Sequence, residues 1–201
     1  MKQEMLMNFT PRLERAIRIA AIAHKNQRRK GTDTPYVTHP FSVMAVASDV
    51  TDDEDVLIAC LFHDIIEDVP NEYPETRMRQ EFGDRVVGIV LGVTKDDSIQ
   101  EWRPRGEAYL KHLKEVASDE SVIVSGADKI HNLMSILADY KIQKEDLWQI
   151  FSTKSAGDQL WWYESVLQVL KDRKTSPKLI DKLEGLVGDL RAIVTELPKP
   201  Q

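Results

Sequence analysis

Apolar residues recur at helical spacing along almost the whole of this 201-residue chain, and no other feature constrains its fold as strongly. Leu13, Ile17 and Ala20 illustrate the pattern, because residues three or four positions apart lie on one face of a helix. No run of alternating β-branched residues bounded by turn residues predicts a strand. The sequence therefore predicts an all-α protein.

Caps and turn residues divide this pattern into separate helices. Thr10 before Pro11 is a good N-cap followed by a good first helical residue, and Thr38 shortly before Pro40 marks a second helix start. The polar segment 95–104 interrupts the pattern and predicts an irregular loop. We expect helices within residues 9–27, 37–50, 52–66, 75–82, 84–94, 105–117, 119–140, 156–173 and 177–197.

The length of the chain suits one domain with a substantial core. We find no internal repeat, no low-complexity stretch and no linker in the sequence. We therefore expect a single helical bundle over residues 1–201, with its core at about 10–172 and a C-terminal helix at about 177–196.

Composition and charge argue against several classes of protein. Hydrophobic residues make up 42% and charged residues 30% of the chain, as in a soluble globular protein, and the net charge of −6 disfavours a nucleic-acid partner. No apolar run approaches the roughly 18 residues of a membrane span, and the N-terminus lacks the apolar core of a signal peptide. Cys60 is the only cysteine, which excludes an internal disulfide and fits a reducing compartment. We expect a cytoplasmic protein, and the sequence leaves its oligomeric state open.

The segment "ACLFHDIIEDVP", residues 59–70, places four ionisable residues at the end of an apolar run. On one helix, His63 would lie over Glu67 and Asp64 over Asp68, because residues four apart stack on the same face. A solvated helix terminus is the simplest interpretation of a His-Asp pair taken by itself. The rest of the chain favours a different interpretation.

His39 stands at the start of a helix, and Asp128 lies in a helix that is apolar on its preceding turns. Neither has a local partner of opposite charge on its apolar side, whereas one divalent cation would satisfy both of them together with His63 and Asp64. Two imidazoles and two carboxylates suit Mn²⁺, Fe²⁺ or Zn²⁺ better than Ca²⁺. We therefore predict one divalent metal ion, with open coordination positions for water and a phosphate oxygen.

The order of His39, "HD" at 63–64 and Asp128 resembles that of the HD-domain metal-dependent phosphohydrolases. Four segments are also similar to the hydrolase domain of the RelA/SpoT family, including its small alarmone hydrolases. They are "AHKNQRRKGTDTPYVTHP", "ACLFHDIIEDV", "FGDRVVGIVLGVTKDD" and "ADKIHNL". The resemblance runs from Ala16 to Leu170 and implies an HD-type helical bundle.

Members of that family remove the 3′-pyrophosphate from (p)ppGpp, usually with Mn²⁺. The resemblance implies that His39, His63, Asp64 and Asp128 bind the metal. It also implies that the Glu67-Asp68 pair positions or deprotonates the attacking water. Because no synthetase domain fits in this length, we expect any alarmone activity to be degradative only.

The resemblance also implies a set of substrate-binding residues. Arg29 and Lys30 would bind the phosphates and base, although composition alone favours a solvated helix end for "QRRK". Asn132 would hold the nucleoside. Lys95 and Lys129 are weaker phosphate-binding candidates, and each could equally be a surface lysine.

Three consecutive aromatic residues, Trp161, Trp162 and Tyr163, cannot all share one helical stripe. We expect core packing for two of them, and base stacking is the interpretation that the resemblance adds for Trp162. Whether they line a pocket, the core or an interface is left open. Trp102, in the polar segment, would cover the site or pack back onto it.

The chain departs from the family pattern at Val69, Ser125 and Gly126, and in the segment after Lys95. We expect these departures to lie around the substrate pocket, so two alternatives stay open. One is hydrolysis of another nucleotide, such as a nucleoside monophosphate or a phosphorylated dinucleotide. The other is a catalytically silent nucleotide-binding regulator, which the complete set of ligands and carboxylates disfavours.

Overall fold

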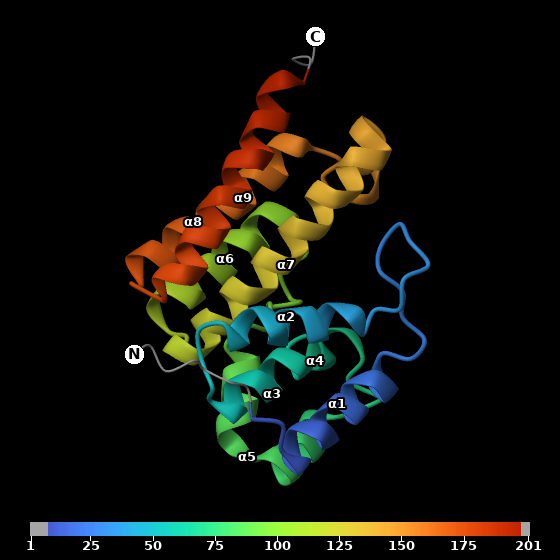
Figure 1. Ribbon diagram of the computed structural model, residues 1–201, viewed down its shortest axis with the longest axis vertical. Helices are drawn as coiled ribbons and strands as arrows, with labels where there is room; N and C mark the ends of the chain where they lie inside the picture. Colours follow the sequence, from blue (N-terminus) through green and yellow to red (C-terminus); the bar gives the residue numbers. More distant parts are fainter. Residues whose placement is uncertain (1–7, 198–201) are drawn as a thin grey trace.

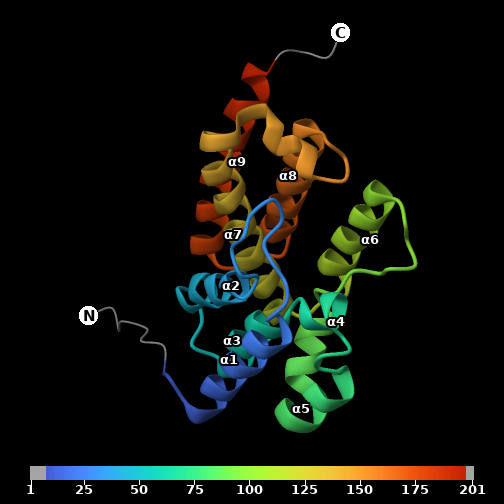
Figure 2. The same cartoon turned by 90° about the vertical axis from the view of Figure 1, so that its right-hand side faces the viewer.

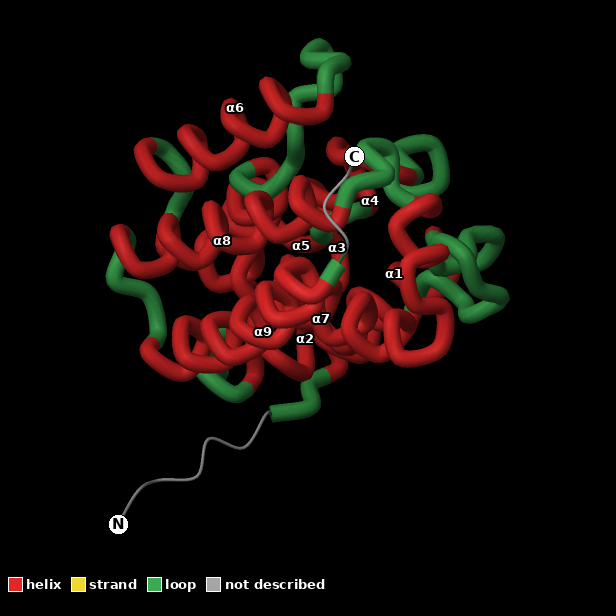
Figure 3. Tube along the Cα trace, turned by 90° about the horizontal axis from the view of Figure 1, so that it is seen from above, coloured by secondary structure: helices red, strands yellow, loops and turns green. Residues whose placement is uncertain are grey.

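The computed structural model describes residues 8–197, and this part of the chain consists of helices and loops with no named strand (Figure 3). Arg28 and Pro35 form an isolated antiparallel bridge within one loop. The all-α prediction is therefore confirmed. The helices are α1 (Pro11–Ala23), α2 (Thr38–Ser48), α3 (Glu54–Phe62), α4 (Ile65–Asp68), α5 (Glu75–Leu91), α6 (Trp102–Glu115), α7 (Asp119–Gln143), the 3₁₀ helix η1 (Lys144–Ile150), α8 (Ala156–Asp172) and α9 (Pro177–Glu196).

The long helix α7 joins the two halves of the bundle. It packs against α8 and α9 in the upper half of Figure 1 and against α2 and α3 in the lower half. The residues from Val56 to Phe62 in α3 are all buried, as expected for a helix that is apolar on every side. The ends of α2 and α3 and the middle of α7 therefore meet inside the core.

Helix α5 contains a break that the sequence predicts. Gly83 has φ 89° and ψ 169°, a conformation that glycine adopts without the steric penalty of a side chain. The two expected helical segments, 75–82 and 84–94, thus form one element with a break between them, and its last residue is Leu91.

The prediction that Trp102 lies in an irregular loop is wrong. Helix α6 begins at Trp102, and Pro104 occupies its first turn. Proline is tolerated there because the first backbone N–H groups of a helix have no intrahelical partner. The start of α6 moves Trp102, Arg103 and Pro104 from the expected loop onto a helix.

The expectation of one continuous helix carrying His63, Asp64, Glu67 and Asp68 is also wrong. Helix α3 ends at Phe62, and the short α4 starts at Ile65. The backbone N–H of Asp68 still donates to the carbonyl of Asp64 at 2.8 Å, so a helical turn follows the break. The break places His63 and Asp64 between two elements.

Helix α6 is set apart from the other helices in Figure 2, and its main contacts are with α8. None of the helices in residues 8–197 is long and apolar enough to cross a membrane.

Candidate metal centre and adjoining pocket

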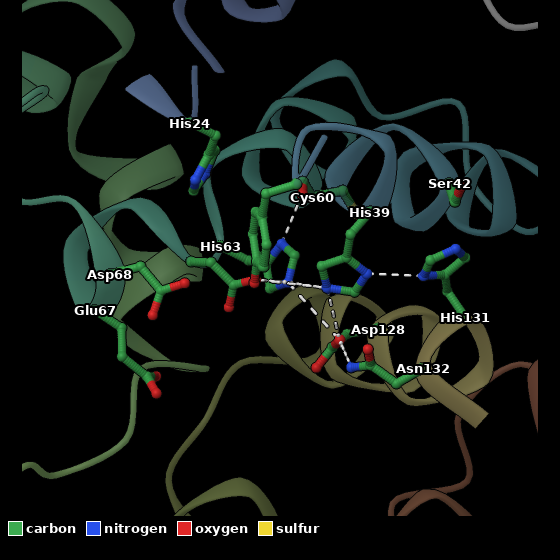
Figure 4. A network of polar contacts seen from close by, with 12 residues as sticks. His24, His39, Ser42, Cys60, His63, Glu67, Asp68, Asp128, His131 and Asn132 are labelled. Atoms are coloured by element: carbon green, nitrogen blue, oxygen red, sulfur yellow. Dashed lines mark hydrogen bonds and ion pairs between the residues drawn. The ribbon is translucent and has the colours of Figure 1, made fainter. Parts of the chain in front are cut away.

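Three separate elements bring the predicted ligands together. His39 belongs to the first turn of α2, His63 and Asp64 lie at the break between α3 and α4, and Asp128 lies in the middle of α7 (Figure 4). One donor atom each from His39, His63 and Asp128 lies within 4.8 Å of the other two. These three residues are 1%, 4% and 6% exposed.

The nitrogen and oxygen atoms of the cluster face one another. His39 Nε2 is 3.2 Å from His63 Nε2 and 3.2 Å from Asp128 Oδ1. Asp64 Oδ2 is 3.0 Å from His63 Nε2 and 3.5 Å from His39 Nε2. His39, His63 and Asp128 therefore form the centre of the cluster, and Asp64 joins it through its contacts with both histidines.

The Nδ1 atom of each imidazole, on the side away from the cluster, has its own polar contact. His63 Nδ1 is 2.8 Å from the carbonyl of Cys60, and since a carbonyl only accepts, this nitrogen carries a proton. His39 Nδ1 lies 2.7 Å from His131 Nδ1. Burial and the neighbouring His39 lower the pKa of His131 to about 4, so the ring of His131 is neutral and can accept. Both Nε2 atoms are thus oriented toward the centre, the arrangement typical of metal-binding histidines.

The charges of the cluster favour a cation. Burial disfavours a charged imidazole, but the negative charges of Asp64 and Asp128 outweigh it and raise the pKa of His63 to about 9. Burial also opposes ionisation of Asp128, but Lys129 and His39 hold the pKa of its carboxyl well below the ordinary value. With neutral imidazoles, two carboxylates and two nitrogen donors would match a divalent ion of the first transition series. The residues present therefore fit a divalent metal.

Side chains around the cluster hold the two carboxylates in place. The Tyr36 hydroxyl donates to Asp64, and the Asn132 amide donates to one oxygen of Asp128. The Lys129 ammonium contacts the other oxygen of Asp128. Since Lys129 is 6% exposed, the alternative that it is a surface lysine is wrong.

Glu67 and Asp68 lie together to one side of the histidines in Figure 4. Glu67 accepts from the backbone N–H of Lys95 at 3.3 Å, and its carboxylate is 3.5 Å from the Lys95 ammonium. Asp68 accepts from the side chain of Gln27 at 3.3 Å. Desolvation and the negative charge of Asp64 raise the pKa of Asp68. Both carboxylates are therefore held at the edge of the cluster.

A pocket of about 260 Å³ adjoins the cluster. Its lining includes the Asn132 and Gln159 amides, and Asn132 and Lys129 connect it to the cluster through their contacts with Asp128. Gln159 is 6% exposed, and no hydrogen bond of its side chain to the described residues is present. The cationic residues of the lining are Lys30, Lys95, Arg105 and Lys129, and the aromatic ones are Trp102, Phe151, Trp162 and Tyr163.

The predicted substrate-binding residues divide into two groups. Lys30, Lys95, Lys129, Asn132 and Trp162 line this pocket. The sixth, Arg29, does not belong to the lining of the pocket.

Arg29 instead donates to Asn132 Oδ1 at 2.9 Å, and its guanidinium lies 5.7 Å from the centre of the Tyr36 ring. Arg29 therefore holds the side chain of Asn132 from outside the pocket lining. In the aromatic triplet, Tyr163 is buried and Trp162 half-buried, and both line the pocket, whereas Trp161 packs against Trp102 of α6.

Sequence reasoning did not find Tyr36, Arg105 or Gln159. The tyrosine follows Pro35 in a loop, and no sequence spacing relates it to Asp64. Gln159 has no signal of its own in an amphipathic helix. Arg105 does have one, because it lies in the segment that departs from the family pattern.

The expectation that the departures at Ser125 and Gly126 surround the pocket is wrong. Neither residue lines it. Ser125 is 1% exposed and accepts a hydrogen bond from the Tyr109 hydroxyl at 2.8 Å. A Cβ at Gly126 would come within 3.2 Å of Leu170, so this glycine allows α7 to lie close to α8. Both departures therefore act through helix packing.

Comparisons with known proteins agree with this geometry. Residues 16–153 match the family described as the HD domain. Over 203 aligned residues the chain is 29% identical to the guanosine-3′,5′-bis(diphosphate) 3′-pyrophosphohydrolase of Aquifex aeolicus, covering 96% of this chain and 29% of that protein. It is 36% identical over 126 residues to a protein named GTP pyrophosphokinase from Streptomyces coelicolor, covering 62% of this chain and 14% of that protein. The chain thus spans less than a third of the length of these curated relatives.

A solved structure resembles the fold over nearly its whole length. It is described as a metazoan ortholog of SpoT that hydrolyzes ppGpp. The two chains superpose with a TM-score of 0.76 at 26% identity, covering 94% of this chain and 99% of that one.

Proposed function

The chain belongs to the HD-domain family, and from this premise we propose that it is a metal-dependent phosphohydrolase acting on guanosine 3′,5′-bis(diphosphate). The reaction would add water to the 3′-pyrophosphate group and release GDP and inorganic pyrophosphate. Relatives named for this activity, and a solved structure described as hydrolyzing ppGpp, support the proposal. We further propose Mn²⁺ as the metal and the cytoplasm as the location.

The observation that carries the proposal is a buried cluster beside a cationic pocket. The cluster consists of His39, His63 and Asp128, with Asp64 in contact with both histidines. A polar cluster of this kind is costly to bury unless a common partner compensates it. When bound, a divalent cation would neutralise phosphate charge and acidify water. His39, His63, Asp64 and Asp128 would hold this cation, and Lys129 and Asn132 connect Asp128 to the pocket.

In this proposal Glu67 accepts the proton of the attacking water. Its carboxylate lies one turn after His63 and is held by both nitrogens of Lys95, so its position is fixed. Asp68, held by Gln27, orients the same water. A positioned carboxylate typically contributes about a hundredfold to ten-thousandfold in rate as a general base.

The pocket would bind the nucleotide. Trp162 offers an indole face for the base, and the Asn132 and Gln159 amides can both donate and accept hydrogen bonds. Burial opposes the charge of Lys129, but Asp128 raises the pKa of its ammonium, which therefore stays cationic. A fixed cation between cluster and pocket would stabilise the charge that develops on the transferring phosphoryl group.

One experiment tests the proposal directly. Metal-stripped protein is given guanosine 3′,5′-bis(diphosphate), nucleoside monophosphates and a phosphorylated dinucleotide, each with and without Mn²⁺, and the products are separated by chromatography. We expect GDP and pyrophosphate from the first substrate, only with metal. Turnover of a different nucleotide would keep the site and reject the substrate, and no turnover of any of them with metal bound would favour the binding-protein alternative.

A further inference from the structure

Helix α6 is held against the indoles of α8. The ring of Trp102 is 5.5 Å from that of Trp161, and the ring of Tyr109 is 5.7 Å from that of Trp162. A Cβ at Gly106 would come within 3.3 Å of the Trp162 ring, so the glycine allows this close approach. The aromatic contacts thus attach a helix that is otherwise set apart from the bundle (Figure 2).

Polar contacts hold α6 at two further points. The buried Tyr109 hydroxyl donates to Ser125 of α7. At the C-terminal end of α6, Arg173 donates to the carbonyl of Leu113 at 2.7 Å and to that of Ala117 at 2.9 Å. The last carbonyls of a helix have no intrahelical partner, so this arginine satisfies that of Leu113 and also binds the chain just after the helix. The side chains that α6 presents to the pocket are therefore fixed in place.

Arg105 is the cation that α6 contributes to the pocket, and it differs from two other cations there. Lys95 and Lys129 contact the carboxylates of Glu67 and Asp128 at the metal centre. The partner of Arg105 is Asp97, 3.7 Å away and 69% exposed. An exposed pair of this kind contributes little to stability, so an anionic ligand can replace it.

Lys129 and the neighbour of Arg105 both contact the Trp162 indole. The Lys129 ammonium is 5.6 Å from the centre of the Trp162 ring, and Gly106, the neighbour of Arg105, packs on the same ring. No carboxylate belongs to the described lining, although the whole chain has a net charge of −6. A concentration of positive charge in one cavity favours a ligand with several negative charges. Since Lys95 and Lys129 already contact carboxylates of the cluster, Arg105 is the lining cation whose carboxylate partner is exposed and lies outside it.

We propose that Arg105 is a specificity-determining residue whose guanidinium binds a second phosphate group of the nucleotide, remote from the group that reacts at the metal centre. The proposal rests on the proposed function. Such a contact would let the pocket distinguish this substrate from a nucleotide that carries phosphate groups on the 3′ side alone. Guanidinium suits this role because it pairs with phosphate through two parallel hydrogen bonds.

The test compares two substrates that differ only in the second group, guanosine 3′,5′-bis(diphosphate) and guanosine 3′-diphosphate. We expect wild-type protein with Mn²⁺ to prefer the first in kcat/KM. Arg105→Gln should reduce this preference by about tenfold to a hundredfold, the range for a hydrogen bond to a charged group. Lys111→Gln is the matched control, because it removes one positive charge from an exposed position of the same helix outside the pocket.

An unchanged preference in Arg105→Gln, or an equal loss in Lys111→Gln, would overturn the proposal. Calorimetric binding of the same two nucleotides separates it from the proposed function. If wild-type protein turns over neither nucleotide, tighter binding of the bis(diphosphate) that Arg105→Gln weakens at least tenfold would still support the second subsite. Equal binding of both nucleotides, or binding of neither, would overturn it. Thermal unfolding of each variant checks that the fold is retained.

Discussion

The metal centre and the pocket wall formed by α6 adjoin one another, but they are built in opposite ways. His39 and His63 are almost fully buried, and each has a second contact, with His131 and Cys60, that orients its ring. In the wall, the Arg105 side chain is 34% exposed and its weak partner is an exposed carboxylate. The core holds the groups proposed for the reaction, and a peripheral helix presents a group proposed for recognition.

This difference has a consequence for substitutions. Changing the metal centre removes groups that also stabilise the core, so activity, metal content and stability should fall together. A change in the α6 wall should alter KM and leave the metal centre intact. Four predictions test this contrast, from the largest expected effect to the smallest.

Removing Asp128 should have the largest effect. Asp128→Ala takes away one proposed ligand and leaves the buried Lys129 ammonium without its partner. We expect loss of bound metal, a fall in activity of roughly a thousandfold or more, and a loss of about 3 kcal/mol in stability. Elemental analysis, turnover and chemical unfolding measure the three quantities.

Asp139→Ala, on the same helix but outside the pocket and the cluster, is the control for Asp128→Ala. It should keep wild-type metal content and activity. Metal retained at the wild-type level in Asp128→Ala would remove this residue from the proposed ligand set.

Glu67→Gln should separate the chemical step from metal binding. The amide keeps the size of the side chain but cannot take a proton from water. We expect the variant to retain the metal and to lose about a hundredfold or more in kcat. Glu72→Gln, whose carboxylate faces an exposed lysine 3.6 Å away, is the control and should match wild type. Turnover at the parent rate in Glu67→Gln would show that a different group accepts the proton.

The stability of the metal-free protein should depend on pH through His63. Its folded pKa of about 9 lies above the unfolded value of 6.5. The resulting stability is therefore fully present below pH 6.5 and is lost as the pH rises through 9. We expect a decrease of about 3 kcal/mol across this interval.

Urea unfolding of metal-stripped protein at several pH values measures this decrease. His63→Gln, which has no titrating ring, is the control and should not show it. Stability that stays constant or rises over the interval in the metal-stripped wild type would contradict the proposed charge balance of the cluster.

Ser125→Ala should give the smallest effect and should act on the wall alone. The change leaves the buried Tyr109 hydroxyl without its acceptor, which costs about 1 kcal/mol. Because this contact holds α6 against α7, we expect KM to rise by at most about fivefold, the factor equivalent to that free energy, with kcat and metal content unchanged. Ser135→Ala is the control, since that hydroxyl bonds only to a carbonyl of its own helix, that of His131. A fall in kcat without a change in KM would refute the assignment of Ser125 to the wall.

Local patterns were sufficient for the fold class and for most helix positions. Cap residues such as Thr10, and the glycine at 83, act through neighbouring backbone groups, so their effects can be predicted from short segments. The start of α6 was not predicted, because aromatic contacts with α8 stabilise a first turn that looks like a polar loop. The break after Phe62 was missed for a similar reason, since apolar periodicity continues across it.

In the candidate site, too, some features were predictable from the sequence and others depended on tertiary contacts. The order and spacing of His39, His63, Asp64 and Asp128 identify them as proposed ligands, because this chemistry needs those residue types. The roles of Tyr36 and Arg29 could not be foreseen, because their partners, Asp64 and Asn132, lie far away in the chain.

The sequence by itself determined that this chain is all-helical, and it supplied the side chains that we propose as ligands of a divalent cation. Helical periodicity, caps and residue chemistry are local properties, so they can be recognised in the sequence without knowledge of the fold. Only the tertiary structure decided that Arg105 and Gln159 share a pocket with Lys129. Their proximity depends on how α6 and α8 pack against α7, which is a sum of many small contacts between residues distant in sequence.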